Sequence, residues 1–295
     1  MMIHFFFLCE RLIQGIEGIF LLYIIISMHS LLRYLALMLK IIKRFMISSF
    51  FMLTFVAILN HSIMTFKQMF TSSVGKKLVM GFTGIFLILF LIVHAGLNAT
   101  IWANDGGLMF NKAGHFMGSN AVPRVLEIGL FLFIFLHIIQ GYLLTLENKS
   151  KRAVGYAVTY KDGSKWYSRS MALLGTLILL FLIAHIYHFW TPSRLGGIGN
   201  IKALGEMEHN GVKLHNLYAE MDIVFTNPYV VVLYVLACGS LAYHLAHGFQ
   251  SAFKTIGVYN KRYQAIITSM GYGFAILIPL LFALMPLSFY FDWIK

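Results

Sequence analysis

Charged side chains are scarce in this sequence. Only 12% of its 295 residues are Asp, Glu, Lys or Arg, and only 11 are acidic. Soluble domains carry about 25% charged residues, so the composition excludes an ordinary soluble protein and favours an integral membrane protein. Cysteine is also rare: Cys9 and Cys238 can form no disulfide framework and no CxxC metal motif.

The sequence contains long apolar runs with few charged residues. Five of them follow Lys77, at 78–101, 124–147, 167–190, 228–253 and 264–290. Each is long enough to cross a hydrocarbon core, which takes about 20 helical residues. The runs are continuous, unlike the alternating ten-residue segments of a membrane β-barrel. The sequence therefore predicts an all-α transmembrane fold, a five-helix bundle, over residues 67–295.

Residues 1–66 form a separate hydrophobic segment. Its two apolar pieces, near 18–28 and 45–59, are short for spanning, and Lys40, Lys43 and Arg44 divide them. Three interpretations remain open: an extra membrane-associated segment, a signal-like region, or a stretch upstream of a later start at Met64 or Met69. We expect no functional residue in it.

Basic residues alternate between the two sides of the predicted bundle. The connection 148–166 holds five Lys or Arg side chains, and three more lie between spans four and five, whereas the connection 102–123 has one Lys and one Asp. The positive-inside rule then places the start of span one in the cytoplasm and the C-terminus outside. Because the positive charge follows membrane topology, no nucleic-acid partner is expected; basic cytoplasmic loops could instead dock a soluble partner.

Ionisable side chains at membrane depth mark functional sites, and here they are histidines. Spans one to four contain them and span five contains none: His94 in span one, His137 in two, His185 and His188 in three, and His244 and His247 in four. For a single histidine, an interhelical hydrogen bond is an equally good explanation. Four helices that each carry one favour a shared function.

The depths of these histidines sort them into two pairs. His94 lies eight residues before Trp102, and His185 lies five before Trp190. Both fall in the outer half of the membrane. His137 is ten residues before Glu147 and His244 ten before Lys254, so both fall toward the inner half. At about 1.5 Å per residue, the two levels should differ by on the order of 10–15 Å.

Two imidazoles from facing helices are a ligand set for haem, which takes only axial ligands from the protein. We therefore predict two bis-histidine haems, held by His94 with His185 and by His137 with His244. Zinc would need further ligands. Six glycines could clear space for the rings or serve tight helix packing: Gly81, Gly84, Gly129, Gly141, Gly175 and Gly239. His188 and His247 could bond haem propionates or a quinone, but they are expected to be interfacial polar residues near helix ends.

Four segments carry a family resemblance. They read KKLVMGFTGIFLILFLIVHAGLN, AGHFMGSNAVPRVLEIGLFLFIFLHIIQGY, GTLILLFLIAHIYHFW and YVLACGSLAYHLAHGFQSAFKTIG. In this order they resemble the single-subunit, di-haem cytochrome b of succinate dehydrogenase and fumarate reductase, over about residues 70–291. In that family, histidines of spans one and three hold the distal haem, and those of spans two and four hold the proximal haem. The resemblance thus implies the same pairing as the depths.

The resemblance also implies partners and a location. It implies a multi-pass anchor in a bacterial cytoplasmic membrane, with a flavoprotein carrying FAD and an iron–sulfur protein on the cytoplasmic face. Electrons from succinate would reach menaquinone through the two haems, so this chain would transfer electrons without catalytic residues of its own. The family pattern does not require residues 1–66. Some members have a glutamate just before the span-four ligand, where this chain has Leu241, Ala242 and Tyr243.

A quinone site is expected near the outer haem, where a quinone carbonyl needs a hydrogen-bond donor and a route for protons. The candidates at the outer ends of spans one and two are Asn98, His115, Arg124 and Glu127. Each could equally anchor a loop. Alternative functions are the di-haem quinone cytochrome of another dehydrogenase, such as a formate dehydrogenase, a proton-coupled transporter that uses membrane histidines, or an anchor without haem.

Overall fold

The computed structural model describes residues 65–150 and 170–294. The interpretations of residues 1–64 therefore lie outside the described part, which forms one compact unit from Phe66 onward. Five of its helices are long and apolar enough to cross a membrane: Ser73–Ala103, Ala121–Ser150, Met171–Leu195, Pro228–Thr255 and Gln264–Tyr290. This confirms the prediction of an all-α bundle and identifies a multi-pass membrane protein.

The helices follow one another along the chain with short elements between them. After α2 (Phe66–Thr71), span one consists of α3 (Ser73–Asn98) and the 3₁₀ turn η1 (Ala99–Ala103), and α4 (Leu108–Ser119) leads to span two, α5 (Ala121–Ser150). Span three contains α7 (Met171–His185), the π-helical turn η2 (Ile186–Trp190) and α8 (Thr191–Leu195). Strands β1 (Glu206–His209) and β2 (Val212–His215) precede α9 (Leu217–Phe225), α10 (Pro228–Thr255) and α11 (Gln264–Tyr290).

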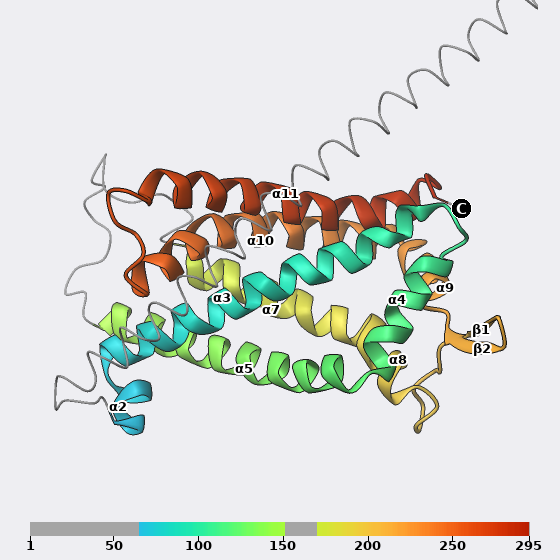
Figure 1. The fold of residues 1–295 in the computed structure, drawn as a ribbon, viewed down its shortest axis with the longest axis horizontal. Coiled ribbons are helices and arrows are strands. Elements are labelled where there is room, and N and C mark those ends of the chain that lie inside the picture. The colour runs from blue at the N-terminus through green and yellow to red at the C-terminus, as the bar shows by residue number, and fades with distance from the viewer. Residues whose placement is uncertain (1–64, 151–169, 295) are drawn as a thin grey trace, which may run out of the picture. The chain divides into compact units, whose positions relative to one another are not determined.

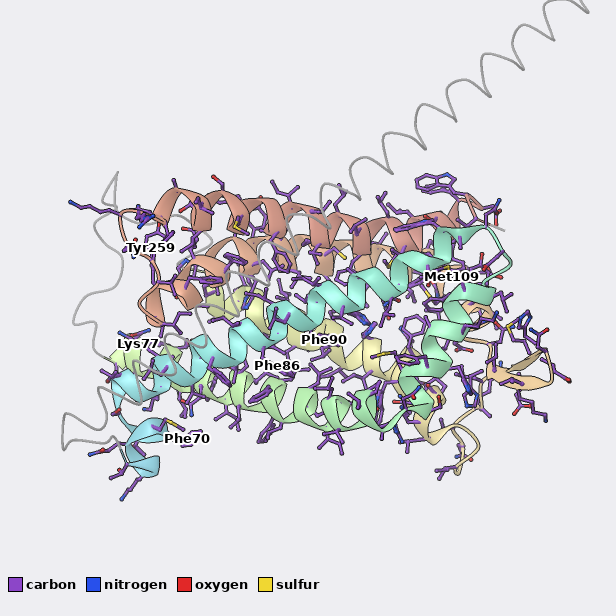
Figure 2. The ribbon with its side chains drawn as sticks, in the orientation of Figure 1. Phe70, Lys77, Phe86, Phe90, Met109 and Tyr259 are labelled. Carbon is purple, nitrogen blue, oxygen red and sulfur yellow. The ribbon has the colours of Figure 1, made fainter. Side chains whose placement is uncertain are left out.

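The long helices run side by side, with successive spans antiparallel, so the bundle has two ends (Figure 1). One end contains the start of α3 and is called the Lys76 end. The other contains η1 and is called the Trp102 end; there α4, α8, α9 and the β1–β2 hairpin gather (Figure 1). Apolar helices suit the bilayer because all their backbone hydrogen bonds are internal, and the many exposed Leu, Ile, Val and Phe side chains cover the bundle as lipid contacts would require (Figure 2).

Polar side chains cap the first turns of α3 and α10, and the cap of α3 extends that helix past the predicted apolar run. Span one begins at Ser73 rather than 78, since the Ser72 Oγ accepts a hydrogen bond from the Gly75 N–H at 3.0 Å. The extra turn brings the Lys76 side chain, 10% exposed, into an ion pair with Glu147 of α5. At α10, the Asn227 side chain accepts from the Tyr229 N–H, and Pro228 occupies the first turn.

Span three is interrupted by a wider turn. The Thr191 N–H donates to the Ile186 carbonyl, five residues back, and not to a carbonyl four back as in an α-helix. Such π-helical turns are rare and are found mostly at functional sites. Here the turn begins directly after His185, so the residues beyond it are rotated relative to a continuous α-helix.

A short antiparallel hairpin at the Trp102 end was not predicted. Its strands pair Glu206 with His215 and His209 with Val212. Asn210 and Gly211 connect them, with φ of 53° and 76°. Two consecutive residues of positive φ are typical of the tight turn that Asn-Gly favours between strands. The hairpin lies outside the spans and leaves the all-α membrane fold unchanged.

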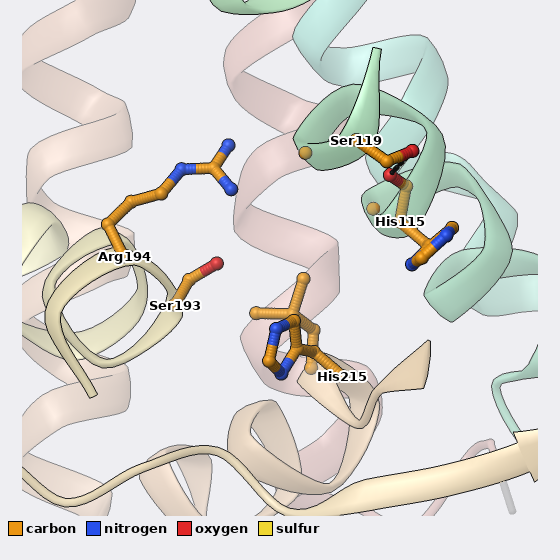
Figure 3. Close-up of a pocket in the computed structure, with 8 residues that line it drawn as sticks. His115, Ser119, Ser193, Arg194 and His215 are labelled. Atoms are coloured by element: carbon orange, nitrogen blue, oxygen red, sulfur yellow. Dashed lines mark hydrogen bonds between the residues drawn. The ribbon is translucent and has the colours of Figure 1, made fainter. Parts of the chain in front are cut away.

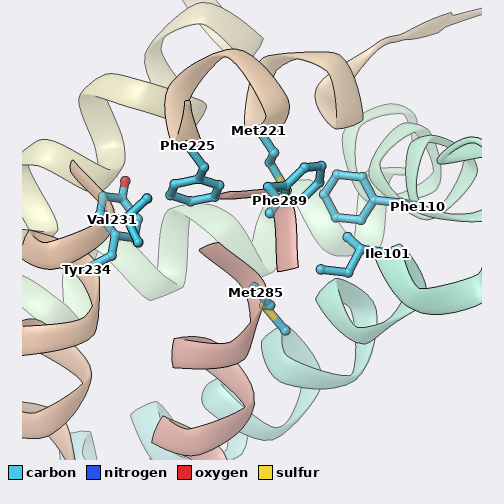
Figure 4. Packing of buried hydrophobic residues seen from close by; sticks show 8 residues of the cluster. All are labelled: Ile101, Phe110, Met221, Phe225, Val231, Tyr234, Met285 and Phe289. Carbon is cyan, nitrogen blue, oxygen red and sulfur yellow. The ribbon is translucent and has the colours of Figure 1, made fainter. Parts of the chain in front are cut away.

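A cluster of buried apolar residues closes the Trp102 end. It joins η1, α4, α9, α10 and α11 through Ile101, Phe110, Met221, Phe225, Val231, Tyr234, Met285 and Phe289 (Figure 4). Alongside it, the Trp102 Nε1–H donates to the Ser288 Oγ at 2.9 Å and ties span one to span five. This packing fixes the first turns of α10, and with them the position of Tyr234 beside His185.

Candidate functional site: two histidine pairs and a polar pocket

The first histidine pair joins spans one and three. The rings of His94 on α3 and His185 on α7 lie with centroids 5.8 Å apart and planes at 89°. Both side chains are partly buried within the bundle. The two histidines that the sequence predicted to share the outer level are therefore neighbours.

Aromatic rings enclose this outer pair. Phe90 stacks on His94 at 5.1 Å and Phe181 stacks on His185 at 5.5 Å, each from one turn earlier in its own helix. Phe282 of α11 packs against His94 from another side, and Tyr234 lies 6.2 Å from His185. On α3, Phe86 and Phe90 occupy successive turns (Figure 2). Aromatic rings thus form much of the surroundings of the outer pair.

The second pair joins spans two and four. The rings of His137 on α5 and His244 on α10 lie with centroids 6.3 Å apart and planes at 65°. Its surroundings are less crowded than those of the outer pair, because glycines approach both rings. A Cβ on Gly84 would lie 3.7 Å from His137, and one on Gly175 or Gly248 would lie 4.0 Å from His244.

The two pairs occupy separate levels. Thr83, which contacts His137, precedes His94 by 11 residues on α3 (83 to 94), roughly 16 Å along the axis at about 1.5 Å per residue. Tyr234, beside His185, precedes His244 by 10 residues on α10 (234 to 244), roughly 15 Å. These values agree with the upper end of the expected range.

Hydrogen bonding divides each pair into one partnered and one unpartnered ring. The Nδ1 of His137 lies 3.1 Å from the Thr83 Oγ1, and that of His94 lies 3.4 Å from the Asn98 Nδ2. The buried Nδ1 atoms of His185 and His244 have no hydrogen-bond partner among the described residues. A buried polar atom without a partner costs about 1–3 kcal/mol, so packing alone does not account for these imidazoles.

The inner pair meets two criteria for holding an iron porphyrin, and the outer pair meets one of them. Axial imidazoles on one metal have centroids about 6–6.5 Å apart, given metal–nitrogen bonds of about 2.0–2.1 Å. The inner pair lies within this range, and the outer pair is slightly closer. The donor set is also suitable, because haem iron takes one or two axial side chains from the protein. His94 with His185 and His137 with His244 are thus the residues that would hold two haems.

The structure separates the six glycines proposed to make room for haem. Only Gly84 and Gly175 lie against a histidine of the pairs. A Cβ on Gly81 would meet Thr255 at 3.2 Å and one on Gly141 would meet Met80 at 3.5 Å, so these two serve helix packing. Gly129 and Gly239 have no neighbour within 4 Å among the described residues, so a Cβ at either position would meet open space.

His188 is less peripheral than its expected interfacial role suggests. Its Nδ1 lies 2.9 Å from the Tyr234 hydroxyl, and the two rings stack at 5.9 Å. Because Tyr234 also packs against His185, this hydrogen bond links the outer pair to the π-helical turn. His247 lies three residues after His244 on α10 and is partly buried.

A charged cluster lies beyond the outer pair, at the Trp102 end. Arg194 of α8 binds both carboxylate oxygens of Glu127, through Nε at 3.1 Å and Nη2 at 3.2 Å. The Trp190 Nε1–H donates to the same carboxylate at 2.5 Å, and Arg124, 49% exposed, contacts it at 3.0 Å. Glu127 therefore joins span two to the end of span three.

A pocket of about 160 Å³ opens beside this cluster (Figure 3). It lies between α4, α8 and the connection to α9, and its lining is Gly114, His115, Gly118, Ser119, Ser193, Arg194, His215 and Leu217. A Cβ at Gly118 would lie 2.9 Å from the Arg194 Nη1, so a larger residue there would displace the end of the arginine side chain. The pocket offers cationic and hydroxyl donors to a small ligand with carbonyl or anionic oxygens.

The four proposed quinone residues fall into two groups. His115 lines the pocket, and Glu127 and Arg124 belong to the cluster that holds its Arg194. Asn98 is not among the lining residues: its amide donates to the carbonyl of His94 at 2.8 Å, one turn back on α3. Asn98 is thus a neighbour of the outer histidine pair, separate from the pocket.

Sequence analysis overlooked Thr83, Tyr234 and Arg194. A signal for the aromatic surroundings was nevertheless present, because FLIVH at 90–94 and FLIAH at 181–185 share Phe one turn before His. Thr83, Tyr234 and Arg194 have no such pattern, since their roles depend on contacts between helices. A comparison of the chain with protein-family models, curated proteins and solved structures finds no match to any of them.

Proposed function

We propose that this chain is the di-haem cytochrome b anchor of a succinate:quinone oxidoreductase, of the succinate dehydrogenase and fumarate reductase type. Its task is to connect a soluble dehydrogenase with the quinone pool. The observation that carries the proposal is the convergence of four histidines from four helices into two pairs, with ring centroids 5.8 and 6.3 Å apart. Two levels roughly 15 Å apart suit electron transfer across a bilayer about 30 Å thick.

When bound at these pairs, two b haems would each supply a one-electron redox centre. The residues of the chain hold and insulate them. His94 and His185 would hold one haem, and His137 and His244 would hold the other, each through an imidazole nitrogen. Phe90, Phe181 and Phe282 pack against the rings of the outer pair. Full axial ligation favours electron transfer over oxygen chemistry.

The pocket at the Trp102 end is the proposed site for the quinone head group. The Arg194 guanidinium and the Ser193 hydroxyl are the proposed donors for a quinone carbonyl, because the Ser119 hydroxyl donates to the His115 carbonyl at 2.8 Å. Half-buried His115 and exposed His215 complete the polar lining. The volume of about 160 Å³ is small beside the usual 300–1,000 Å³ of drug-sized sites. It suits a ring with its isoprenoid tail left in the lipid.

The Lys76 end is the proposed docking face for a flavoprotein carrying FAD and for an iron–sulfur protein. Basic residues concentrate there, including Lys77, Lys149, Lys254, Lys261 and Arg262, which supports a cytoplasmic location by the positive-inside rule. The inner pair, His137 and His244, is the one nearer to this face. Menaquinone is the proposed quinone, in a bacterial cytoplasmic membrane.

Purification of the intact complex tests this function. We expect two haem b per chain by pyridine haemochrome, together with flavin and succinate-dependent quinone reduction. Two haems with molybdenum in place of flavin would indicate another quinone dehydrogenase, such as a formate dehydrogenase. A chain without haem bands in reduced-minus-oxidised spectra would contradict the proposal and favour a transporter or a plain anchor.

A further inference from the structure

The ring of His137 is the only one of the four paired imidazoles, within residues 65–150 and 170–294, that has a hydrogen bond of normal length at Nδ1. The Thr83 Oγ1 lies 3.1 Å from this nitrogen, whereas the Asn98 Nδ2 contact to His94 is long at 3.4 Å. The Nδ1 atoms of His185 and His244 have no hydrogen-bond partner in the described part of the chain. The inner pair therefore has one fixed ring and one free ring.

The direction of the Thr83–His137 hydrogen bond follows from where the threonine proton goes. The Thr83 Oγ1 lies 2.8 Å from the Val79 carbonyl and 3.2 Å from the Met80 carbonyl. Peptide carbonyls only accept hydrogen bonds, so the single hydroxyl proton is directed at them. Helical threonines of this chain do the same elsewhere: Thr145 donates to Gly141 at 2.8 Å and Thr176 to Ala172 at 2.9 Å.

With its proton engaged, the Thr83 oxygen can only accept from His137. Thr83 is 1% exposed, so water does not compete for the oxygen. The Nδ1 of His137 must then carry the proton, because an unprotonated Nδ1 would face the oxygen lone pairs. In a neutral imidazole one nitrogen donates and the other accepts. The remaining nitrogen, Nε2, therefore keeps its lone pair.

We infer that Thr83 is a positioning residue that fixes His137 in the Nδ1–H tautomer and so presents Nε2 as a metal ligand. The inference rests on the proposed function for the identity of the metal, but the tautomer itself does not depend on it. Hydrogen bonds of this kind orient a ligand histidine and increase its basicity, and their loss typically costs 10–100-fold in metal affinity. His244, without such a bond, is the weaker ligand of the inner pair.

Three variants of the full chain test the inference. Thr83→Val keeps the shape and removes the acceptor, Thr83→Ser keeps the acceptor, and Thr176→Val removes an equivalent helical hydroxyl from the exposed face of α7. In the purified complex, we expect Thr83→Val to release one haem about 10–100-fold more readily to a haem acceptor. The midpoint potential of that haem should rise, since a less basic imidazole stabilises ferric iron less. Thr83→Ser and Thr176→Val should match the unaltered protein.

A second measurement does not require haem. Nitrogen-15 spectra of histidine-labelled, haem-free protein distinguish the two tautomers, and His137→Gln identifies the signal of His137. We expect Nδ1–H in the unaltered chain and in Thr83→Ser, and a shift toward Nε2–H in Thr83→Val. If the chain never binds haem but its spectra show this pattern, the proposed function is wrong and the tautomer assignment still holds. The inference would be overturned if the unaltered chain showed the Nε2–H tautomer of His137. It would also be overturned if Thr83→Val and Thr176→Val had the same rate of haem release and the same midpoint potential.

Discussion

His94 on α3 and His185 on α7 lie with ring centroids 5.8 Å apart, although 91 residues separate them in the sequence (94 to 185). The second pair, His137 and His244, is formed by the two other helices that carry paired histidines. No residue belongs to both pairs. The two proposed haems should therefore be lost independently of each other.

Replacement of one histidine in a pair tests this independence. We expect His137→Ala or His244→Ala to leave about one haem per chain, because the remaining imidazole is a single axial ligand. His94→Ala or His185→Ala should remove the other haem. Pyridine-haemochrome stoichiometry with redox titration identifies which centre remains. Two haems retained in both His137→Ala and His244→Ala would defeat the assignment of the inner pair.

Histidines next to the pairs serve as matched controls. His188→Ala and His247→Ala should keep both haems, because these rings lie one turn from the pairs and outside them. His188→Ala should still perturb the outer centre, since Tyr234 loses its 2.9 Å hydrogen bond while remaining packed against His185. A shifted absorption band with unchanged haem content is the expected signature. If His247→Ala lost a haem and His244→Ala did not, the choice within span four would be wrong.

Gly84 of α3 lies beside His137 and Gly175 of α7 lies beside His244, so a larger residue at either position tests the space around the inner pair. In Gly84→Leu and Gly175→Leu the new side chains extend toward His137 and His244, where a Cβ alone would lie 3.7 and 4.0 Å away. Overpacking costs about 1–3 kcal/mol, so haem affinity at the inner pair should fall by roughly 5- to 150-fold. Gly239→Leu, on an exposed position of α10 with no neighbour within 4 Å, should retain both haems. Equal haem content in all three variants would contradict the role of these glycines.

The Glu127–Arg194 pair should affect quinone chemistry without affecting haem. Lysine cannot replace the two-pronged contact of arginine, so Arg194→Lys should raise the KM for quinone about tenfold while both haems remain. Glu127→Gln should act in the same direction, because it removes the carboxylate that aims Arg194. Arg124→Ala, at a more exposed contact to the same carboxylate, should change the KM less than twofold, as surface ion pairs contribute about 0.2–1 kcal/mol. Quinone kinetics on each purified variant give the comparison. An unchanged KM in Arg194→Lys would remove the pocket as the quinone site.

Stability at the opposite end should depend on Lys76 and Glu147. Loss of one partner leaves the other charge partly buried, so Lys76→Met or Glu147→Leu should destabilise the bundle by about 1–3 kcal/mol. The double variant should recover part of this loss, because apolar replacement of a buried ion pair is often neutral. Thermal unfolding in detergent measures both effects. Purely additive losses in the double variant would show that the two side chains do not stabilise each other.

The sequence was sufficient for the spans and for the pairing of the histidines. Apolar run length predicted all five helices, and distance from interfacial residues predicted which histidines share a level. Helix ends were less accurate, because caps such as Ser72 extend α3 into polar sequence. Asn210–Gly211 is a typical sequence for the tight turn of a hairpin, but the length of apolar runs carries no information about it.

Contacts between helices could not be predicted from the sequence. Thr83 has no spacing that distinguishes it from Thr176, and only the packing of α3 against α5 brings its hydroxyl to His137. Arg194 likewise lies past the predicted end of span three at residue 190, although its guanidinium reaches back to Glu127 of another span. Hydrogen bonds between segments distant in sequence depend on the rotation of each helix, which apolar runs do not determine.

The π-helical turn at Ile186–Trp190 makes the two halves of span three separable by mutation. A turn of this kind holds one more residue than an α-helical turn, so it shifts every later side chain by roughly 100° about the axis. Deletion of one residue between Ile186 and Trp190 would restore an ordinary helix and swing Arg194 away from Glu127, while His185, before the turn, would keep its orientation toward His94. A single-codon deletion could therefore uncouple the proposed quinone chemistry from haem binding, and natural variation of substrate preference could arise by the same step without any change to the metal centres.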